Sequence, residues 1–402
     1  MKSKIIRYII YSFFVMILFL TSSLWSDSFT TSPQIACGYS HTVALKKDGT
    51  VWTWGYNNYG QLGDGSNNSS SIPIHVKNLT EIVAIAAGGE HSIAIKRDGT
   101  VWTWGNGESG QLGNRTDRSS KIPINVEGLT DIIAVAGGYY HTVALKRDGT
   151  VWTWGNGEVG QLGNGLDRSS KIPINVEGLT DIIAVAAGAW HTVALKKDGT
   201  VWTFGSNRYG QLGDGTKVRK NTPTQVKYLT DIVGIACGFF HTVVLKKDGT
   251  VWTWGANNRG QLGCGDSTER TVPVKAKGLT NIISIAAGGV QTIALKKNGT
   301  VYYCGPSNTG LWGENFYLRP VQIKTLTDII LISEGGGHTV ALKRDGTVWT
   351  WGSGGSGQLG RTVDKTSLTR PAPIKNFNLM EVIMEKPEEI RTNSELDRKD
   401  IP

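Results

Sequence analysis

The chain has 402 residues, including 52 glycines and 12 prolines. Hydrophobic residues make up 39% of it, which is enough apolar material for a folded core and excludes a wholly disordered protein. Four cysteines exclude a scaffold built on disulfides, and a net charge of +9 permits an acidic partner without requiring one.

The chain begins with a segment typical of an export signal. Lys2, Lys4 and Arg7 precede an apolar run at 8–20, and small polar residues follow it. This run of 13 residues is shorter than the span of about 20 that a membrane-crossing helix needs. We therefore predict a signal peptide over 1–26 and a secreted or extracytoplasmic protein, located in the periplasm or at the cell surface. An uncleaved membrane anchor is the alternative.

One sequence motif then occurs seven times. It reads His-Thr-Val-Ala-Leu-Lys-Lys-Asp-Gly-Thr-Val-Trp-Thr-Trp-Gly at 41–55, and returns with changes every 50 residues, then after 47, at His91, His141, His191, His241, Gln291 and His338. Within one unit, the segments 182–187, 191–196, 201–204 and 224–226 have the pattern of short strands, called A to D below. Asp198-Gly199 is a hairpin turn signal between B and C. Four strands per unit in seven units predict an all-β fold, a seven-bladed β-propeller over 34–384.

The two ends of the repeat region differ from its middle. The segment Leu-Met-Glu-Val-Ile at 379–383 resembles the Leu-Thr-Asp-Ile-Ile that precedes strand A in other units, so we expect it to close the ring beside the N-terminal strand of blade 1. Residues 385–402 are polar and have no periodicity, which predicts a disordered tail.

Three motifs together resemble the regulator of chromosome condensation repeat. They are Gly-x-x-His-Thr-Val-Ala-Leu, Asp-Gly-Thr-Val-Trp-Thr-Trp-Gly and Gly-Gln-Leu-Gly. The last stands at 60–63, 110–113, 160–163, 210–213, 260–263 and 357–360, while unit six has Gly-Leu-Trp-Gly at 310–313. The resemblance implies a seven-bladed β-propeller, here as an exported, bacterial-type member.

The resemblance is less specific for function. The founding member is a nuclear exchange factor for the GTPase Ran that uses an inserted β-hairpin wedge, and the regular spacing here shows no such insertion. Another relative is a secreted propeller that inhibits β-lactamases. The resemblance therefore implies two alternatives: guanine-nucleotide exchange on a Ran-like small GTPase in a host cell, or inhibition of a secreted enzyme. Because one fold hosts many functions, the function has to be inferred from the residues of the binding or active site.

Strand parity assigns the variable segments to one face of the disc. Strands alternate in direction, so the A–B turn and the C–D loop share a face. Both vary between units and are rich in Tyr, Phe, Trp and Arg, which dominate binding hot spots. We predict a partner-binding face made of Tyr39, Tyr56, Tyr59, Tyr139, Tyr140, Trp190, Arg208, Tyr209, Phe239, Phe240 and Arg259. The alternative is that these aromatics fill the central channel as packing.

The opposite face carries a Lys-Lys or Lys-Arg pair in every B–C turn, beside turn and linker acids. Nucleic-acid binding without sequence preference needs a predominantly positive stripe, so this mixed rim does not favour it.

Catalytic and metal motifs are missing from the sequence. The six repeated histidines fall one per blade, whereas a zinc site needs three or four ligands around one ion, so we expect them to bond backbone groups within or between blades. The repeated Trp pairs predict inter-blade packing. Cys264 and Cys304 fall near one face of adjacent blades, and whether they pair stays open.

The leading hypothesis is an exported, non-enzymatic propeller that binds a protein ligand through the variable aromatic face. We expect a monomer without cofactor or metal, in contact with a membrane only through an uncleaved N-terminal segment.

Overall fold

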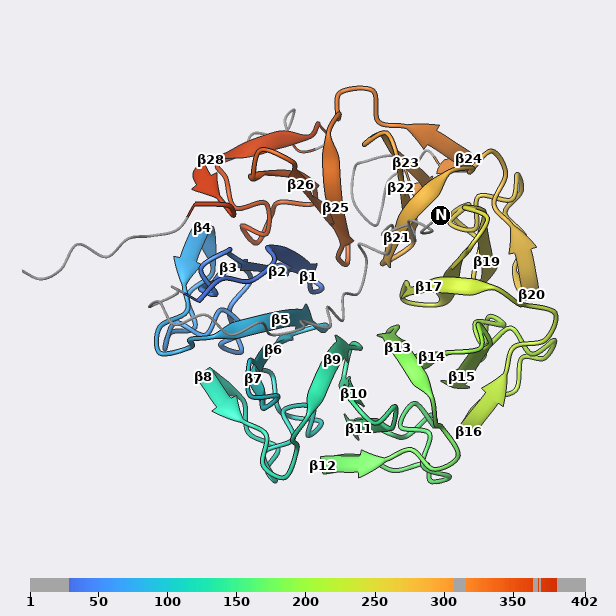
Figure 1. The fold of residues 1–402 in the computed structure, drawn as a ribbon, viewed down its shortest axis with the longest axis horizontal. Coiled ribbons are helices and arrows are strands. Elements are labelled where there is room, and N and C mark those ends of the chain that lie inside the picture. The colour runs from blue at the N-terminus through green and yellow to red at the C-terminus, as the bar shows by residue number, and fades with distance from the viewer. Residues whose placement is uncertain (1–28, 307–315, 364–367, 369, 382–402) are drawn as a thin grey trace, which may run out of the picture.

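The computed structural model describes residues 29–306, 316–363, 368 and 370–381. These residues form seven antiparallel sheets of four strands each, arranged as blades around a central axis (Figure 1). The predicted seven-bladed β-propeller is therefore confirmed. The predicted signal peptide and tail lie outside the described residues, and no helix within the described part is long and apolar enough to cross a membrane.

Every blade follows the same order from the axis outward (Figure 1). The innermost A strands are β1 Gln34–Cys37, β5 Ile82–Ala87, β9 Ile132–Gly137, β13 Ile182–Ala187, β17 Ile232–Cys237, β21 Ile282–Gly288 and β25 Ile329–Glu334. The B strands are β2 His41–Leu45, β6 His91–Lys96, β10 His141–Lys146, β14 His191–Lys196, β18 His241–Lys246, β22 Gln291–Lys296 and β26 His338–Lys343.

The C strands are mostly buried, whereas the D strands at the rim contain mainly partly buried and exposed residues. The C strands are β3 Val51–Gly55, β7 Val101–Gly105, β11 Val151–Gly155, β15 Val201–Gly205, β19 Val251–Gly255, β23 Val301–Pro306 and β27 Thr347–Gly352. The D strands at the rim are β4 Ser70–His75, β8 Ser120–Asn125, β12 Ser170–Asn175, β16 Lys220–Gln225, β20 Arg270–Lys275, β24 Phe316–Gln322 and β28 Ala372–Asn378.

The unit used for prediction shows what sequence patterns detect. The predicted segments 182–187 and 191–196 coincide with β13 and β14. The D strand was placed wrongly at 224–226, because β16 already begins at Lys220, which pairs with Gly205 across a register shift. The side chains of this outer edge strand are all partly buried or exposed, so it lacks the apolar alternation that marks a half-buried strand.

The core lies between blades. One apolar cluster joins Val43 and Leu45 of blade 1 to Ala94 and Trp104 of blade 2, and equivalent clusters recur around the ring. The second tryptophan of each pair is fully buried in such a cluster, as predicted. The first is only partly buried, and in blade 2 the Lys96 amine lies over the Trp102 ring, 4.7 Å from its centroid. This contact allows a cation–π attraction at the rim.

A single carbonyl group ties each blade to the next. The Gln111 carbonyl oxygen accepts the Thr142 hydroxyl at 2.8 Å and the Trp154 indole N–H at 2.9 Å, both from the following blade. Gly113 permits this approach, since a Cβ there would lie 2.8 Å from the Trp154 Nε1. The same double acceptance occurs at the carbonyls of Gln61, Gln211 and Gln358. The Gly-Gln-Leu-Gly motif is therefore an inter-blade connector.

The repeated histidines extend this connection. His91 Nε2 lies 2.9 Å from the Thr142 hydroxyl oxygen. Because that hydroxyl donates its own proton to Gln111, it accepts one from the imidazole. Six junctions have such a pair, so the histidines bond between blades as expected, but each has a side-chain hydroxyl as partner; His41 and His241 also bond the backbone of His91 and Gln291. Burial lowers the pKa of His91 to about 3, which keeps the ring neutral.

The junction between blades 6 and 7 is built differently. Gln291 replaces the histidine and donates its amide to the Pro306 carbonyl. The Glu334 carboxylate accepts the Thr339 hydroxyl instead, and a Cβ on Gly288 would lie 2.6 Å from the Glu334 Cγ. In other blades the equivalent glycine faces its own imidazole, and small residues stand where Glu334 does. Glu334 thus takes the place of the missing histidine.

Both ends of the described chain meet at Lys47, in the B–C turn of blade 1. Its backbone N–H donates to the Leu379 carbonyl, and its carbonyl accepts the Thr31 N–H. Leu379 is fully buried, so the expected contact of the C-terminal segment with blade 1 is present. The innermost strand of blade 1 is β1, and residues 382–383 of the segment lie outside the described residues.

The indole donor should contribute measurably to stability. We expect Trp154→Phe to lower the free energy of unfolding by about 1–2 kcal/mol, because Gln111 loses a buried donor and the core loses volume. Blade 4 already has Phe204 at this position, and Gln161 there accepts the Thr192 hydroxyl. Phe204→Trp should therefore cost less than Trp154→Phe in guanidinium unfolding. Equal costs for both would contradict the role of the indole bond.

Glu334 should make stability depend on pH. Burial raises its pKa to about 8, so the folded protein keeps a proton that the unfolded chain releases above pH about 4.5. The stabilisation by this proton is lost as pH rises towards 8. Six buried histidines gain a proton on unfolding near pH 6.5 and make stability rise with pH in both proteins, so the test is the difference between the natural protein and Glu334→Gln. Over pH 6.5–8.5 the stability of the natural protein relative to Glu334→Gln should fall by roughly 2 kcal/mol, and parallel curves for the two proteins would contradict the prediction.

Candidate functional site: the aromatic face

The A–B turns and C–D loops meet on one face, as strand parity predicted. The backbone N–H of Tyr56, which opens a C–D loop, donates to the Ser40 carbonyl in the A–B turn at 2.8 Å, and Ser206 bonds Trp190 in the same way. We call the surface formed by these turns and loops the aromatic face. Its turns are also bonded from blade to blade, for example from the Tyr39 N–H to the Gly89 carbonyl at 3.0 Å.

Three large rings meet at the centre of this face. Tyr39, Tyr139 and Phe239 come from blades 1, 3 and 5, and their ring centroids are 5.4–5.9 Å apart. The other blades have small residues at this position, namely Gly89, Ala189, Gly289 and Gly336. The small residues are required by the rings, because a Cβ on Gly89 would lie 2.8 Å from the Tyr139 ring. This cluster is called the central plug.

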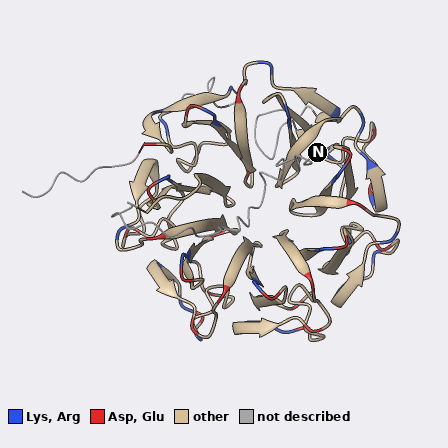
Figure 2. Cartoon of the chain, in the orientation of Figure 1, with Lys and Arg blue, Asp and Glu red and all other residues tan. Residues whose placement is uncertain are grey.

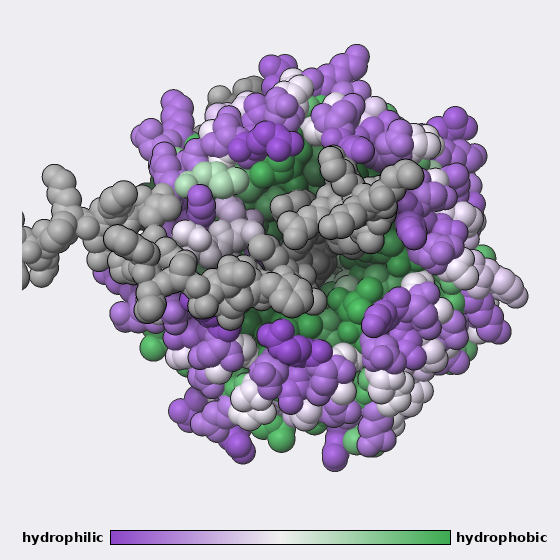
Figure 3. Space-filling view, viewed as in Figure 1, coloured by the Kyte–Doolittle hydropathy of each residue, from purple (hydrophilic) through white to green (hydrophobic). Residues whose placement is uncertain are grey.

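A channel of about 230 Å³ runs along the axis beside the plug. The A strands of all seven blades line it, mainly with alanine, valine and isoleucine, and Figure 3 shows hydrophobic residues around the central hollow. Tyr39, Tyr139 and Phe239 belong to its lining, as does Glu334. The alternative prediction, that aromatics pack at the channel, is therefore right for these three residues.

The remaining aromatics extend the plug outward. The Tyr140 ring lies 4.6 Å from Tyr139 and 5.2 Å from Trp190 between centroids. On the other side, Phe240 lies 6.3 Å from Phe239 and 5.2 Å from Tyr209. All of these side chains are only partly buried. The structure thus brings seven of the predicted residues together as one partly exposed aromatic surface.

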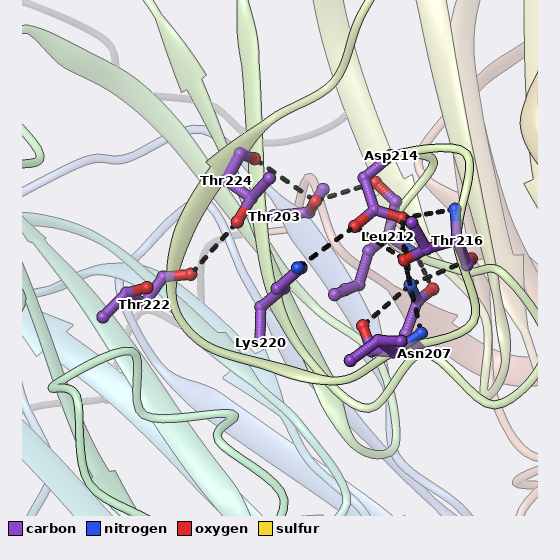
Figure 4. Close-up of polar contacts among 9 residues, drawn as sticks. Thr203, Asn207, Leu212, Asp214, Thr216, Lys220, Thr222 and Thr224 are labelled. Atoms are coloured by element: carbon purple, nitrogen blue, oxygen red, sulfur yellow. Dashed lines mark hydrogen bonds and ion pairs between the residues drawn. The ribbon is translucent and has the colours of Figure 1, made fainter.

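The C–D loops under this surface are held by side-chain hydrogen bonds. In blade 4 the Asn207 amide donates to the Asp214 carboxylate and to the Thr216 and Val218 carbonyls, and its oxygen accepts the Leu212 N–H (Figure 4). Asn207 is buried at the centre of this network. The loop therefore presents its neighbours Arg208 and Tyr209 from a fixed backbone.

The other predicted residues lie outside the seven-residue cluster. Arg208 is exposed, with its guanidinium 5.8 Å from the Tyr209 centroid. Arg259 lies over the Phe316 ring of β24, at 5.2 Å. Tyr56 and Tyr59 contact each other in blade 1, with centroids 6.4 Å apart. These four side chains surround the aromatic surface without stacking on its rings, apart from the Arg208–Tyr209 pair.

Sequence reasoning missed Glu90, the acidic member of this face. Glu90 occupies the second variable position of the blade 2 turn and accepts the Asn106 amide at 3.1 Å. It is half-buried, and burial raises the pKa of its carboxyl group. Blades 3 to 5 have aromatic residues at the equivalent position. This contrast is the sequence signal that could have identified Glu90.

The described part of the aromatic face contains neither a disulfide nor a group of metal-binding side chains. All four cysteines are free thiols, so Cys264 and Cys304 do not pair. Cys304 stands at the tryptophan position of blade 6 and directs its thiol to the Gln261 carbonyl at 3.3 Å. Among the described residues, no group of three or more His, Cys, Asp or Glu side chains could hold a metal ion.

The opposite rim is mixed in sign. Figure 2 shows Lys and Arg beside Asp and Glu around the whole ring. In the B–C turns the aspartates form the turn itself: the Asp148 carboxylate accepts both the N–H and the hydroxyl of Thr150. These bonds lower the pKa of Asp148 and keep it ionised beside the turn lysines.

Fold and repeat together define a β-propeller of seven similar four-stranded blades, six of which carry the glutamine connector. Residues 24–315 match the RCC1-like domain, and 329–358 and 345–384 match the regulator of chromosome condensation (RCC1) repeat. The chain belongs to this RCC1-like family, which confirms the resemblance seen in its motifs.

Solved structures share the whole propeller. Yeast RCC1 (Prp20), solved with Kap60 bound, is 21% identical over 90% of each chain with a TM-score of 0.74. Human WBSCR16 is 23% identical, covers 81% of this chain and 93% of its own, and has a TM-score of 0.71. At these identities the likeness shows the fold.

Sequence relatives match over short segments. The Arabidopsis thaliana ultraviolet-B receptor UVR8 is 42% identical over 52 residues, which are 13% of this chain and 11% of that protein. The Homo sapiens E3 ubiquitin-protein ligase HERC2 is 44% identical over 46 residues, 11% of this chain and 1% of its own length. The chain thus spans a small part of these relatives.

The central plug should depend on its small neighbours. We expect Gly89→Ala to lower the free energy of unfolding by roughly 1–3 kcal/mol, because the added methyl group meets the Tyr139 ring and backbone. Near-ultraviolet circular dichroism should change as the tyrosines move. Gly355→Ala is the matched control, since nothing lies within 4 Å of a Cβ there. An equal effect of both changes would show that the plug is not tightly packed.

Proposed function

We propose that the protein is an exported, non-enzymatic propeller that binds a protein partner through its aromatic face. The observation that carries this proposal is the continuous, partly exposed aromatic surface of Tyr39, Tyr139, Tyr140, Trp190, Tyr209, Phe239 and Phe240. Soluble monomers rarely leave such a surface uncovered unless it is functional.

The scaffold under the surface supports a binding role. Rings that already contact one another lose little conformational freedom on binding, so more of the contact energy remains for affinity. Tyrosine and tryptophan supply large contact areas, and arginines at the edge suit a polar rim. The A–B turns and C–D loops of this face vary between blades, whereas the B–C turns of the opposite face are nearly constant.

The family likeness favours a protein as the partner. Solved structures of Prp20 are described with Kap60 bound and in terms of binding to Gsp1p and histones. Export rests on the apolar run at 8–20 that follows three basic residues. The non-enzymatic role rests on the chemistry of the face, which offers aromatic rings and amides without a nucleophile beside a base.

The proposal is tested by a comparative capture experiment. Residues 27–402 would be immobilised beside a variant with Tyr139, Tyr140, Trp190, Phe239 and Phe240 changed to alanine, and beside a control with Lys47, Lys197 and Lys247 of the opposite rim changed to alanine. Circular dichroism must first show that all three are folded. A partner from secreted or neighbouring-cell protein should bind the natural chain and the rim control, with at least tenfold weaker binding by the aromatic variant.

Two results would overturn this assignment. If the aromatic variant retains the partner and the rim control loses it, the binding face is the Lys/Arg rim. If both variants bind as tightly as the natural chain, the aromatic surface carries no binding energy. Sequencing the N-terminus of the mature protein tests export separately: a start near residue 27 is expected, and an intact residue 1 would favour the uncleaved anchor.

A further inference from the structure

Glu90 stands out on the aromatic face because it is an anion without a cation. It is half-buried, and among the described residues only the Asn106 amide donates to it. The six ion pairs of the described chain all lie elsewhere. A half-buried carboxylate that has lost part of its hydration gains strongly from a cation that approaches it.

The turn that carries Glu90 lies between a turn and a loop that carry tyrosines. Gly89, the neighbour of Glu90, packs against the Tyr139 ring, and Tyr140 contacts Tyr139 with centroids 4.6 Å apart. On the other side, Gly105 lies between the Glu90 carbonyl and Gln61. Gln61 in turn accepts the Tyr59 N–H, so the turn that carries Glu90 lies beside the loop that carries Tyr59.

The electrostatics agree with this placement. The Glu90 charge is the main cause of the raised pKa of Tyr59. Burial first and the Glu90 charge second raise the pKa of Tyr139 and Tyr140. Glu108 also raises the pKa of Glu90, so a second carboxylate lies near it. The C–D loop of blade 2 carries Arg115 and Arg118; Arg115 pairs with Glu127, and among the described residues neither arginine forms an ion pair with Glu90.

We infer that Glu90, Tyr59, Tyr139 and Tyr140 form a binding site for an arginine side chain of the protein partner. This inference rests on the proposed function. A guanidinium is planar, so it can stack on a tyrosine ring while its N–H groups bond the Glu90 carboxylate. A lysine ammonium is a compact point charge with a tighter hydration shell, and it cannot stack in this way. The site, called the Glu90 site, therefore favours arginine.

The site explains how one aromatic surface could orient a partner. Contacts with the plug and with Trp190 are apolar and do not fix a direction. The Glu90 site adds one charged contact on the blade 2 side, opposite in sign to Arg208 and Arg259 on blades 4 and 5. A partner with an arginine at one end of an apolar patch and an acid at the other would match this polarity.

The test uses N-acetyl-arginine amide as the probe and N-acetyl-citrulline amide as its neutral isostere. Binding to the full chain would be followed by nuclear magnetic resonance, through the side-chain amide of Asn106, which donates to Glu90. The arginine probe should bind in the millimolar range and weaken as salt rises, and the citrulline probe should bind at least fivefold more weakly.

Substitutions test separately how much the Glu90 charge and the tyrosine rings contribute to binding of the arginine probe. Glu90→Gln should weaken the arginine probe about fivefold, while Glu158→Gln, an exposed acid in the C–D loop of blade 3, should leave it unchanged. Tyr140→Leu should weaken binding and Tyr140→Phe should retain it, since stacking needs the ring and not the hydroxyl. Equal binding of both probes, or unchanged binding by Glu90→Gln, would overturn the inference. A lysine probe that binds as tightly as arginine would overturn the preference for arginine.

The outcome is separable from that of the proposed function. If the variant with five aromatic residues changed to alanine loses the partner and Glu90→Gln keeps it with unchanged affinity, the inference fails, but the proposed binding role of the aromatic face is retained. If every variant keeps the partner, the proposed function fails, and the arginine probe still decides whether the Glu90 site binds a guanidinium.

Discussion

In six of the seven blades the connection to the next blade depends on one backbone carbonyl, that of the glutamine in Gly-Gln-Leu-Gly. It is buried and sits where two blades meet, so any donor it lacked would cost the full desolvation of the group. Thr142 and Trp154 satisfy it at Gln111, and His91 completes the network through the threonine. The repeat is close at these positions because most blades supply donors to one neighbour and an acceptor to the other.

The sequence predicted the fold well because this network repeats at a fixed period, and the inner strands are apolar and short. It predicted the rim strands poorly, since β16 is made largely of polar residues, with Thr222 and Gln225 exposed. It also found the aromatic residues of the candidate site from their variation between blades. Their partition into plug and outer surface could not be predicted, because it depends on which rings meet across the axis.

The central plug also shows how large and small residues are distributed around an odd number of blades. Large and small residues alternate over blades 1 to 5, but seven positions cannot alternate without a break. Gly289 and Gly336 are therefore both small and adjacent, on the two blades whose junction lacks a histidine and holds Glu334. The irregular side of the plug and the irregular junction coincide. Blades 6 and 7 are consequently the part of the ring with the least internal repetition.

The position of Lys47 has a consequence for how the molecule is oriented. Thr31 and Leu379 both bond the backbone of this residue, which lies in a B–C turn on the face opposite the aromatic rings. The chain therefore enters and leaves the propeller on the same side. A partner bound to the aromatic face therefore lies on the opposite side of the disc from both of these connection points, Thr31 and Leu379.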